Sequence, residues 1–237
     1  MTVITSRQNP RIKTLIKLKK GNDPLLFIEG KNLINMALDL NLVEELFGIS
    51  HFENNLNTTL ISKEVAEKLS EKQSTDGYFA LIRRPSLSLD LTKNLVYLDN
   101  INDPGNLGTI MRTALAFNFG GLLYSPHTVN LYNPKVLSGG QGAHFLLPTR
   151  EYDIEHLKSL KNEGYNIIVS TLETANDLTN LPNGKSVIVL GNEARGVSKE
   201  VAAIATHYVK IPIANIDSLN VAIAGAILMH ELSKLPL

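Results

Sequence analysis

Short apolar runs alternate with segments of helical period over the first 84 residues. Asn9-Pro10 supplies a helix cap and a first-turn proline, and apolar residues follow at positions 12, 15 and 16, the spacing of one helix face. A second helix carries apolar positions 33, 34, 37 and 38, and Ser62 caps a third. The predicted strands of this part are 25–28, 45–49, 58–61 and 78–82. The pattern indicates a small α/β unit.

A polar, proline-led stretch over 85–94 is typical of a linker, and a second alternating pattern follows it. The strands predicted there are 95–98, 121–124, 166–170, 186–190 and 208–211. The helices predicted between and after them are 106–118, 133–141, 154–163, 198–205 and 218–234. Short buried strands that alternate with helices indicate a mostly parallel sheet covered on both faces. We therefore expect an α/β protein with domains at 1–84 and 95–237.

Composition narrows the class of protein. Hydrophobic residues make up 43% of 237 positions, enough for a real core, and this excludes wholesale disorder. The absence of cysteine excludes disulfide scaffolds, thiolate metal sites and cysteine nucleophiles. The longest apolar stretch, Val221 to Met229, is short of the roughly 20 residues that a membrane span needs. With no secretory signal and no histidine pair at metal spacing, we expect a cytoplasmic protein without membrane or metal.

Charge is balanced over the whole chain but not along it. Lysine plus arginine and aspartate plus glutamate number 23 each, so net charge gives no hint of a nucleic-acid partner. The first 20 residues, however, hold six basic residues and no acidic one. These basic residues are Arg7, Arg11, Lys13, Lys17, Lys19 and Lys20. They form either a solvated helix face or a local surface for nucleic acid.

The first segment with candidate chemistry runs from Asp99 to Thr113. A strand ends there in a polar, glycine-punctuated loop, and a helix begins near Asn106. Free N–H groups at a helix N-terminus suit anions, and Arg112 follows six residues later, close to two helical turns on. An ordinary strand-to-helix turn is the competing interpretation.

The second segment follows the strand predicted at 186–190. That strand runs directly into Gly191, Asn192 and Glu193, and Gly196 precedes a capped helix. Ligands of parallel sheets bind outside the carboxyl ends of the strands, which favours a functional role for this glutamate. The alternative is a capping acid beside Arg195.

The third segment runs from Val209 to Ala226. A strand breaks at Pro212, Ser218 has the place of an N-cap, and Asn220 begins an otherwise apolar helix. A buried amide at that place needs hydrogen-bond partners. Familiar nucleotide motifs do not account for the chain: Gly184-Lys185-Ser186 precedes a strand instead of a helix, and G-x-G-x-x-G is absent.

Together, the three segments resemble the three motifs of the SpoU (TrmH-like) RNA ribose 2′-O-methyltransferases, in the family's order and spacing. Asn106 and Arg112 match motif 1, and Ser218 and Asn220 match motif 3. Gly191, Asn192, Glu193 and Gly196 match motif 2. The resemblance implies a C-terminal α/β domain with a deep trefoil knot, S-adenosyl-L-methionine as methyl donor, a homodimer and RNA as substrate. It also implies that the smaller N-terminal α/β domain binds RNA.

The resemblance assigns residues to each task. The implied cofactor site is formed by Thr171, Leu190, Gly191, Asn192, Gly196, Ile211 and Leu219. The implied catalytic set is Arg112, Asn106, Glu193, Ser218 and Asn220. Because a guanidinium stays protonated, we expect Arg112 to grip an RNA phosphate and stabilise the developing alkoxide. The other four would fix Arg112, the ribose and the cofactor, and Arg7, Arg11 and Lys13 would contact RNA phosphates.

One stretch departs from the family pattern. After Asn133-Pro134-Lys135-Val136, many relatives show Arg-x-Ser-x-Gly-Ala, whereas this chain has Ser138 in place of the arginine and Gly140 in place of the serine. The resemblance favours ribosomal RNA as substrate. A transfer-RNA ribose methyltransferase and a non-catalytic RNA-binding or ribosome-assembly protein of the same fold stay open. Retention of the catalytic set argues against the non-catalytic alternative.

Overall fold

The computed structural model describes residues 3–19, 23–52, 57–171 and 176–237 and divides into two compact units. Unit 1 comprises Met1–Pro85 and Tyr132–Phe145, and unit 2 comprises Ser86–Leu131 and Leu146–Leu237. The sequence-based domain boundaries at 84 and 95 stay a prediction. The contacts group Tyr132–Phe145 with unit 1, although this stretch follows the first strands of the second pattern.

Unit 1 is built on a four-stranded mixed sheet in the order β1-β4-β2-β3. Its strands are β1 (Leu25–Glu29), β2 (Val43–Gly48), β3 (Thr58–Leu60) and β4 (Tyr78–Arg83). β4 pairs antiparallel with both β1 and β2, and β2 pairs parallel with β3. All four strands fall where the apolar runs predict them.

The helices of unit 1 cover both faces of this sheet. They are α1 (Pro10–Leu18), α2 (Lys31–Asp39), α3 (Lys63–Leu69) and α5 (Pro134–Gly140). α1 and α3 bury their apolar residues with Phe27 on one face, and α2 packs with Ile28 on the other. Leu137 of α5 joins the Ile28 core. The predicted caps are confirmed: Asn9 accepts from the backbone N–H of Arg11 at 2.8 Å, and Ser62 accepts from Val65.

Unit 2 contains a six-stranded sheet in the order β10-β8-β9-β5-β6-β7. Its strands are β5 (Leu95–Asp99), β6 (Gly121–Tyr124), β7 (Thr149–Glu151), β8 (Asn166–Ser170), β9 (Ser186–Gly191) and β10 (His207–Val209). Every pairing is parallel, which confirms the α/β prediction. β7 was not predicted, because its three residues include no apolar side chain and lie at the sheet edge.

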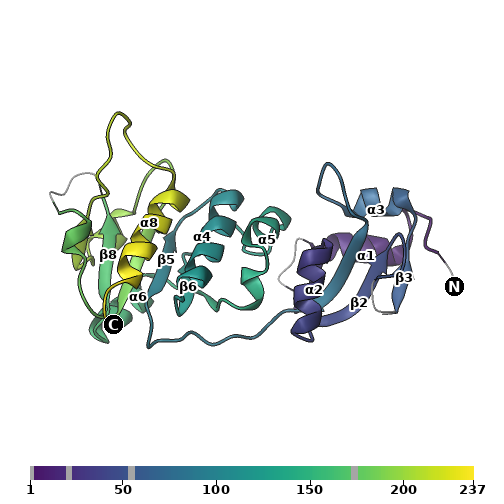
Figure 1. The fold of residues 1–237 in the computed structure, drawn as a ribbon, viewed down its shortest axis with the longest axis horizontal. Helices are drawn as coiled ribbons and strands as arrows, with labels where there is room; N and C mark the ends of the chain where they lie inside the picture. Colours follow the sequence, from purple (N-terminus) through teal and green to yellow (C-terminus); the bar gives the residue numbers. More distant parts are fainter. Residues whose placement is uncertain (1–2, 20–22, 53–56, 172–175) are drawn as a thin grey trace. The chain divides into compact units, whose positions relative to one another are not determined.

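Three helices of unit 2 connect its strands, and a fourth follows the last strand. The connecting helices are α4 (Pro104–Ala116), α6 (Ile154–Asn162) and α7 (Lys199–Ala202), and the last helix is α8 (Val221–Ser233). Short 3₁₀ turns lie at Ala143–Phe145 in unit 1 and at Leu178–Asn180 in unit 2. α8 lies beside α4 (Figure 1) and packs on β9. A Cβ at Gly225 would come within 2.7 Å of Leu190 Cδ1, so the absence of a side chain there lets α8 approach the sheet.

Two helix starts differ from the prediction. α4 begins at Pro104 with Asp103 as its cap, two residues before Asn106. α8 begins at Val221 with Asn220 as its cap, so the expectation of a Ser218 cap is wrong. None of the helices in the described part of the chain combines the length and hydropathy that crossing a bilayer requires.

Candidate active site

Four neighbouring strands of unit 2 end at the same edge of the sheet. The pairings Val209↔Ser170, Val169↔Val189 and Asp99↔Gly191 place the carboxyl ends of β10, β8, β9 and β5 side by side. Loops that follow such strand ends are the usual ligand sites of parallel sheets. The predicted first and second segments both begin at this edge.

Glu193 lies in the loop after β9 and accepts three hydrogen bonds from the start of α4. Its carboxylate receives the Asn106 side-chain amide at 3.0 Å and the backbone N–H groups of Asp103 at 3.2 Å and Asn102 at 3.4 Å. Partial burial opposes ionisation, but the hydrogen bonds from Asn106 and the backbone outweigh it and hold the pKa of Glu193 below its ordinary value. The segment around Glu193 is thereby tied to α4 by a charged acceptor.

The same Asn106 amide also contacts the third segment. Its oxygen accepts from the Asn220 side-chain N–H at 2.9 Å. The Asn220 oxygen in turn accepts from the backbone N–H groups of Ala222 at 2.9 Å and Ile223 at 3.3 Å, which caps α8. Glu193, Asn106 and Asn220 thus form one chain of hydrogen bonds that joins all three segments.

The loop that holds Glu193 is closed by its own backbone. Asn192 and Gly196 exchange two hydrogen bonds at 3.0 and 2.8 Å, and Gly196 has a φ of 70°, which favours glycine. A Cβ at Gly191 would collide with the backbone of Gly196 and Val197. The Asn192 side chain donates to the Asn100 carbonyl at 2.8 Å. These residues therefore have a direct structural role in shaping the loop.

Asp99 belongs to this region but was not among the predicted site residues. Its carboxylate is buried and accepts from the backbone N–H of Ser198 at 2.6 Å and from the Asn100 amide at 2.7 Å. It fixes the chain just beyond the Glu193 loop. The feature of the sequence that points to Asp99 is an acidic residue directly after the apolar run Leu95 to Leu98.

Two members of the predicted catalytic set lie outside the hydrogen-bond chain. Arg112 and Ser218 are exposed, and neither side chain makes a hydrogen bond or ion pair with a residue in the described ranges. Six residues along an α-helix correspond to about 9 Å of rise and about 240° of rotation, so Arg112 and Asn106 lie on different sides of α4. The guanidinium of Arg112 is free to bind an external anion.

Most of the predicted cofactor residues lie at strand ends or in the loops that follow them, whereas Leu219 lies just before α8. Leu190 and Ile211 are buried, Leu219 is half-buried, and the Thr171 backbone N–H donates to the Val209 carbonyl at 3.0 Å. Thr171 follows β8, and Leu190 and Gly191 end the adjacent β9. Apolar side chains combined with backbone polar groups suit a flat heteroaromatic ligand such as adenine. Among the described residues, no group of acidic or histidine side chains has the arrangement of a metal site.

The basic residues predicted to bind RNA lie at the start of unit 1. Arg7 donates to the Glu64 carbonyl at 3.0 Å and pairs with Glu67 at 3.5 Å, and Arg11 forms an ion pair with Glu45. Lys13 is exposed, and its ammonium has no hydrogen-bond or ion-pair partner within the ranges that the structure describes. Acidic side chains of unit 1 thus partly neutralise Arg7 and Arg11.

Comparisons with known proteins identify the family of this chain. The model of the SpoU rRNA Methylase family matches residues 93–230. The chain is 26% identical to the 23S rRNA (guanosine(2553)-2′-O)-methyltransferase RlmP of Bacillus subtilis, over 98% of this chain and 99% of that protein. It is 30% identical to an uncharacterised tRNA/rRNA methyltransferase of Synechocystis, over 96% and 92% of the two chains.

A solved structure extends the match to three dimensions. The crystal structure of an RNA 2′-O ribose methyltransferase superimposes with a TM-score of 0.84 at 26% identity, covering 98% of each chain. The match includes the part of the chain that precedes the family model. This protein is an RNA methyltransferase that belongs to the SpoU rRNA methylase family.

Proposed function

We propose that this chain transfers a methyl group from S-adenosyl-L-methionine to the 2′-hydroxyl of a ribose in ribosomal RNA. The observation that carries the proposal is the hydrogen-bond chain from Glu193 through Asn106 to Asn220, because it assembles the three motif segments into one site. The printed activity of the Bacillus subtilis relative supports ribosomal RNA as the substrate class.

The residues at the strand ends fit the cofactor. Leu190, Ile211 and Leu219 would supply apolar walls, and the backbone around Thr171 and Gly191 would supply hydrogen bonds. When bound, S-adenosyl-L-methionine supplies an electrophilic sulfonium methyl group.

Arg112 is assigned to the RNA. A guanidinium stays protonated in proteins and presents five donors in a planar fork that matches phosphate. Its exposed position, without an internal partner in the described part of the chain, leaves these donors available. Arg112 would hold a backbone phosphate near the reacting ribose and stabilise negative charge as the 2′-oxygen loses its proton.

Glu193, Asn106 and Asn220 act as positioning residues. They connect the loop after β9, the first turn of α4 and the cap of α8, so each segment is held relative to the other two. Ser218 lies two residues before this cap, with an exposed hydroxyl that is available to RNA or cofactor. A site fixed in this way loses little orientation freedom when the RNA binds.

The proposal also includes two structural features of the family, a trefoil knot in unit 2 and a homodimer. It further places the enzyme in the cytoplasm. The apolar side chains of Ile216 and Ile223, 57% and 51% exposed on either side of Asn220, support burial against a second copy. Light scattering of the purified protein tests the dimer, and a mass of one chain would contradict it.

The activity is tested by transfer of a tritiated methyl group to transcribed 16S, 23S and transfer RNA. We expect label in ribosomal RNA, and calorimetry with S-adenosylhomocysteine should give one site per chain. Label in transfer RNA alone would favour the transfer-RNA enzyme. Product binding and RNA binding without any transfer would favour a non-catalytic binder.

A further inference from the structure

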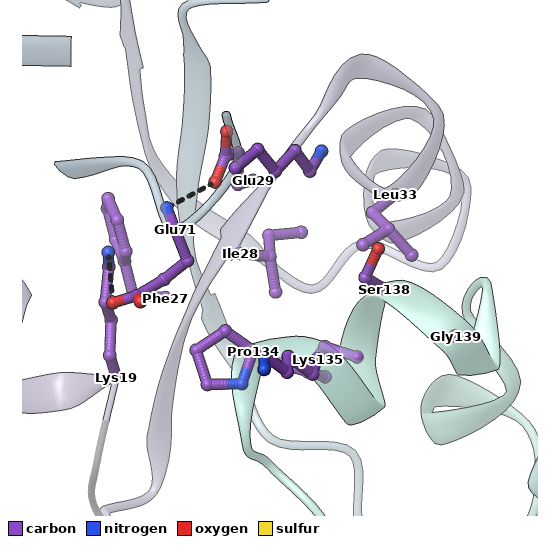
Figure 2. A pocket seen from close by; sticks show the side chains of 12 residues that line it. Lys19, Phe27, Ile28, Glu29, Leu33, Glu71, Pro134, Lys135, Ser138 and Gly139 are labelled. Atoms are coloured by element: carbon purple, nitrogen blue, oxygen red, sulfur yellow. Dashed lines mark hydrogen bonds and ion pairs between the residues drawn. The ribbon is translucent and has the colours of Figure 1, made fainter. Parts of the chain in front are cut away.

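A cavity of about 350 Å³ lies in unit 1. Its walls come from β1, from Leu33 of α2 and from one side of α5. The β1 residues are Phe27, Ile28 and Glu29, and the α5 residues are Pro134, Lys135, Leu137, Ser138 and Gly139. Figure 2 shows Ile28 of β1 above Pro134 and Lys135 of α5. The volume falls in the range of about 300–1,000 Å³ that is typical of small-ligand sites.

The cavity lies against the free edge of the sheet. Successive side chains of a strand point to opposite faces, so a cavity lined by three consecutive residues of β1 reaches the edge of the strand. β1 is the terminal strand in the order β1-β4-β2-β3. The edge of such a strand presents unpaired peptide groups.

The pairing pattern identifies which peptide groups these are. Gly30 donates to the Tyr78 carbonyl at 3.0 Å, and Arg84 donates to the Pro24 carbonyl at 2.8 Å, so alternate residues 24, 26, 28 and 30 form the hydrogen-bonded pairs with β4. The N–H and C=O of Phe27 therefore point away from β4, to the edge that lines the cavity. The peptide groups of Glu29, which also lines the cavity, point the same way, so the edge offers backbone donors and acceptors beside apolar walls.

The charges at the cavity favour an anionic ligand. Lys19 pairs with Glu71 at 3.3 Å, and Glu29 accepts from the Ser70 hydroxyl at 2.6 Å. Lys72 and Lys135 also line the cavity, and their ammonium groups have no hydrogen-bond or ion-pair partner in the described ranges. The Glu29 carboxylate has no cationic partner among the described residues, so the three lysines and two glutamates of the lining leave a net charge of +1 beside apolar walls, which suits a base with an adjoining phosphate.

We propose that this cavity is a second RNA site, which takes an unstacked nucleobase of the substrate, with the Phe27 peptide group on the base edge and Lys72 and Lys135 on the adjoining phosphates. Single-stranded bases are recognised through their polar edges and flat faces. The cavity provides backbone groups for the edge and apolar walls for the faces. The inference rests on the proposed function in taking RNA as the substrate.

Ser138 of α5 lines the cavity, and its short side chain leaves open space that a longer side chain would fill.

Filling the cavity tests the site by RNA binding. Ser138 is exposed on α5, and its side chain has no hydrogen bond among the described residues, so Ser138→Leu adds bulk without removing a contact. We expect this variant to weaken filter binding of transcribed 23S rRNA by about tenfold or more. The exposed Ser159 of α6, whose hydroxyl makes one long hydrogen bond of 3.5 Å to Glu163, supplies the control, and Ser159→Leu should bind within about twofold of wild type. Unchanged thermal unfolding and S-adenosylhomocysteine binding verify that both variants are folded.

Two further measurements locate the contact. A double variant with Lys72→Gln and Lys135→Gln should reduce by about two the slope of log affinity for RNA against log salt concentration. Substitution of Lys68, an exposed lysine of α3, by glutamine should leave this slope unchanged. Wild-type protein irradiated with 4-thiouridine-substituted 23S rRNA should cross-link within 25–34 or 134–139.

Wild-type affinity of Ser138→Leu with no cross-link in these stretches would overturn the inference, and so would a co-purifying peptide cross-linked there in place of RNA. RNA affinity, salt dependence and cross-linking are measured without methyl transfer. A protein that fails to transfer methyl groups can therefore still confirm or contradict the RNA site.

Discussion

The side-chain amide of Asn106 donates to the Glu193 carboxylate at 3.0 Å while its oxygen accepts from Asn220 at 2.9 Å. Both polar ends of one side chain are used, so this amide couples the loop after β9 to the cap of α8. A change at any of the three residues affects the contacts of the other two.

Asn106→Asp should reduce methyl transfer by about tenfold or more, because it replaces the donor to Glu193 with a second carboxylate. A negative charge near a helix N-terminus is otherwise stabilising, so a loss reports the broken hydrogen bond. Tritium transfer measures the effect, and Asn183→Asp, at an exposed position of unit 2, controls for the added charge. Wild-type activity of Asn106→Asp would show that the amide has no positioning role.

Glu193 should make stability depend on pH. Its pKa lies below the ordinary value of 4.5, so its contribution to the free energy of unfolding is fully present above about pH 4.5 and is lost as the pH falls through the lower native pKa. The stability advantage of wild type over Glu193→Gln in urea titrations should therefore shrink as the pH falls below about 4.5 and through the lower native pKa of Glu193. Glu200→Gln controls for the loss of one charge. An advantage that is constant over this range would contradict the assignment.

Arg112→Ala should abolish methyl transfer and leave binding of S-adenosylhomocysteine nearly intact. The reason is that the guanidinium, free of partners within the described chain, is assigned to RNA and to the developing alkoxide. Transfer assays and calorimetry on the same preparation separate the two effects. Arg150→Ala, which removes an exposed arginine of β7, is the matched control. Activity within a few-fold of wild type would refute the role given to Arg112.

Joint neutralisation of Arg7, Arg11 and Lys13 should weaken RNA binding and flatten its dependence on salt. Because Arg7 and Arg11 already pair with Glu67 and Glu45, Lys13→Gln alone should account for much of the change. Filter binding over a salt series measures the slope. Lys158→Gln removes a paired lysine of α6 as a control. An unchanged slope in the triple variant would place the RNA surface elsewhere.

Local signals in the sequence were sufficient for most of the fold. Asn9-Pro10 and Ser62 cap the helices that they predict, since a cap depends on neighbouring residues only. The strand β7 was not predicted, because pairing at a sheet edge holds a segment that has no apolar pattern of its own. The start of α4 at Pro104 instead of near Asn106 follows a local rule, because proline favours the first helical position and Asp103 caps the helix before it.

The site was predictable in its residues but less so in its contacts. Glu193, Asn106 and Asn220 stand out in the sequence, yet their hydrogen bonds join positions about 90 to 115 residues apart. Asn220 is the cap instead of Ser218, because its amide accepts from the backbone of α8 and also donates to Asn106. Such a choice depends on a tertiary partner that no local pattern reveals.

The central claim is methylation of a ribose 2′-oxygen, and alkaline hydrolysis of the labelled RNA product tests it most directly. Alkali cleaves RNA through the free 2′-hydroxyl, so a 2′-O-methylated nucleotide stays joined to its neighbour. After transfer of tritiated methyl to transcribed 23S rRNA, the account predicts label in alkali-resistant dinucleotides, and its loss in Arg112→Ala. Label in mononucleotides would show base methylation and contradict the account.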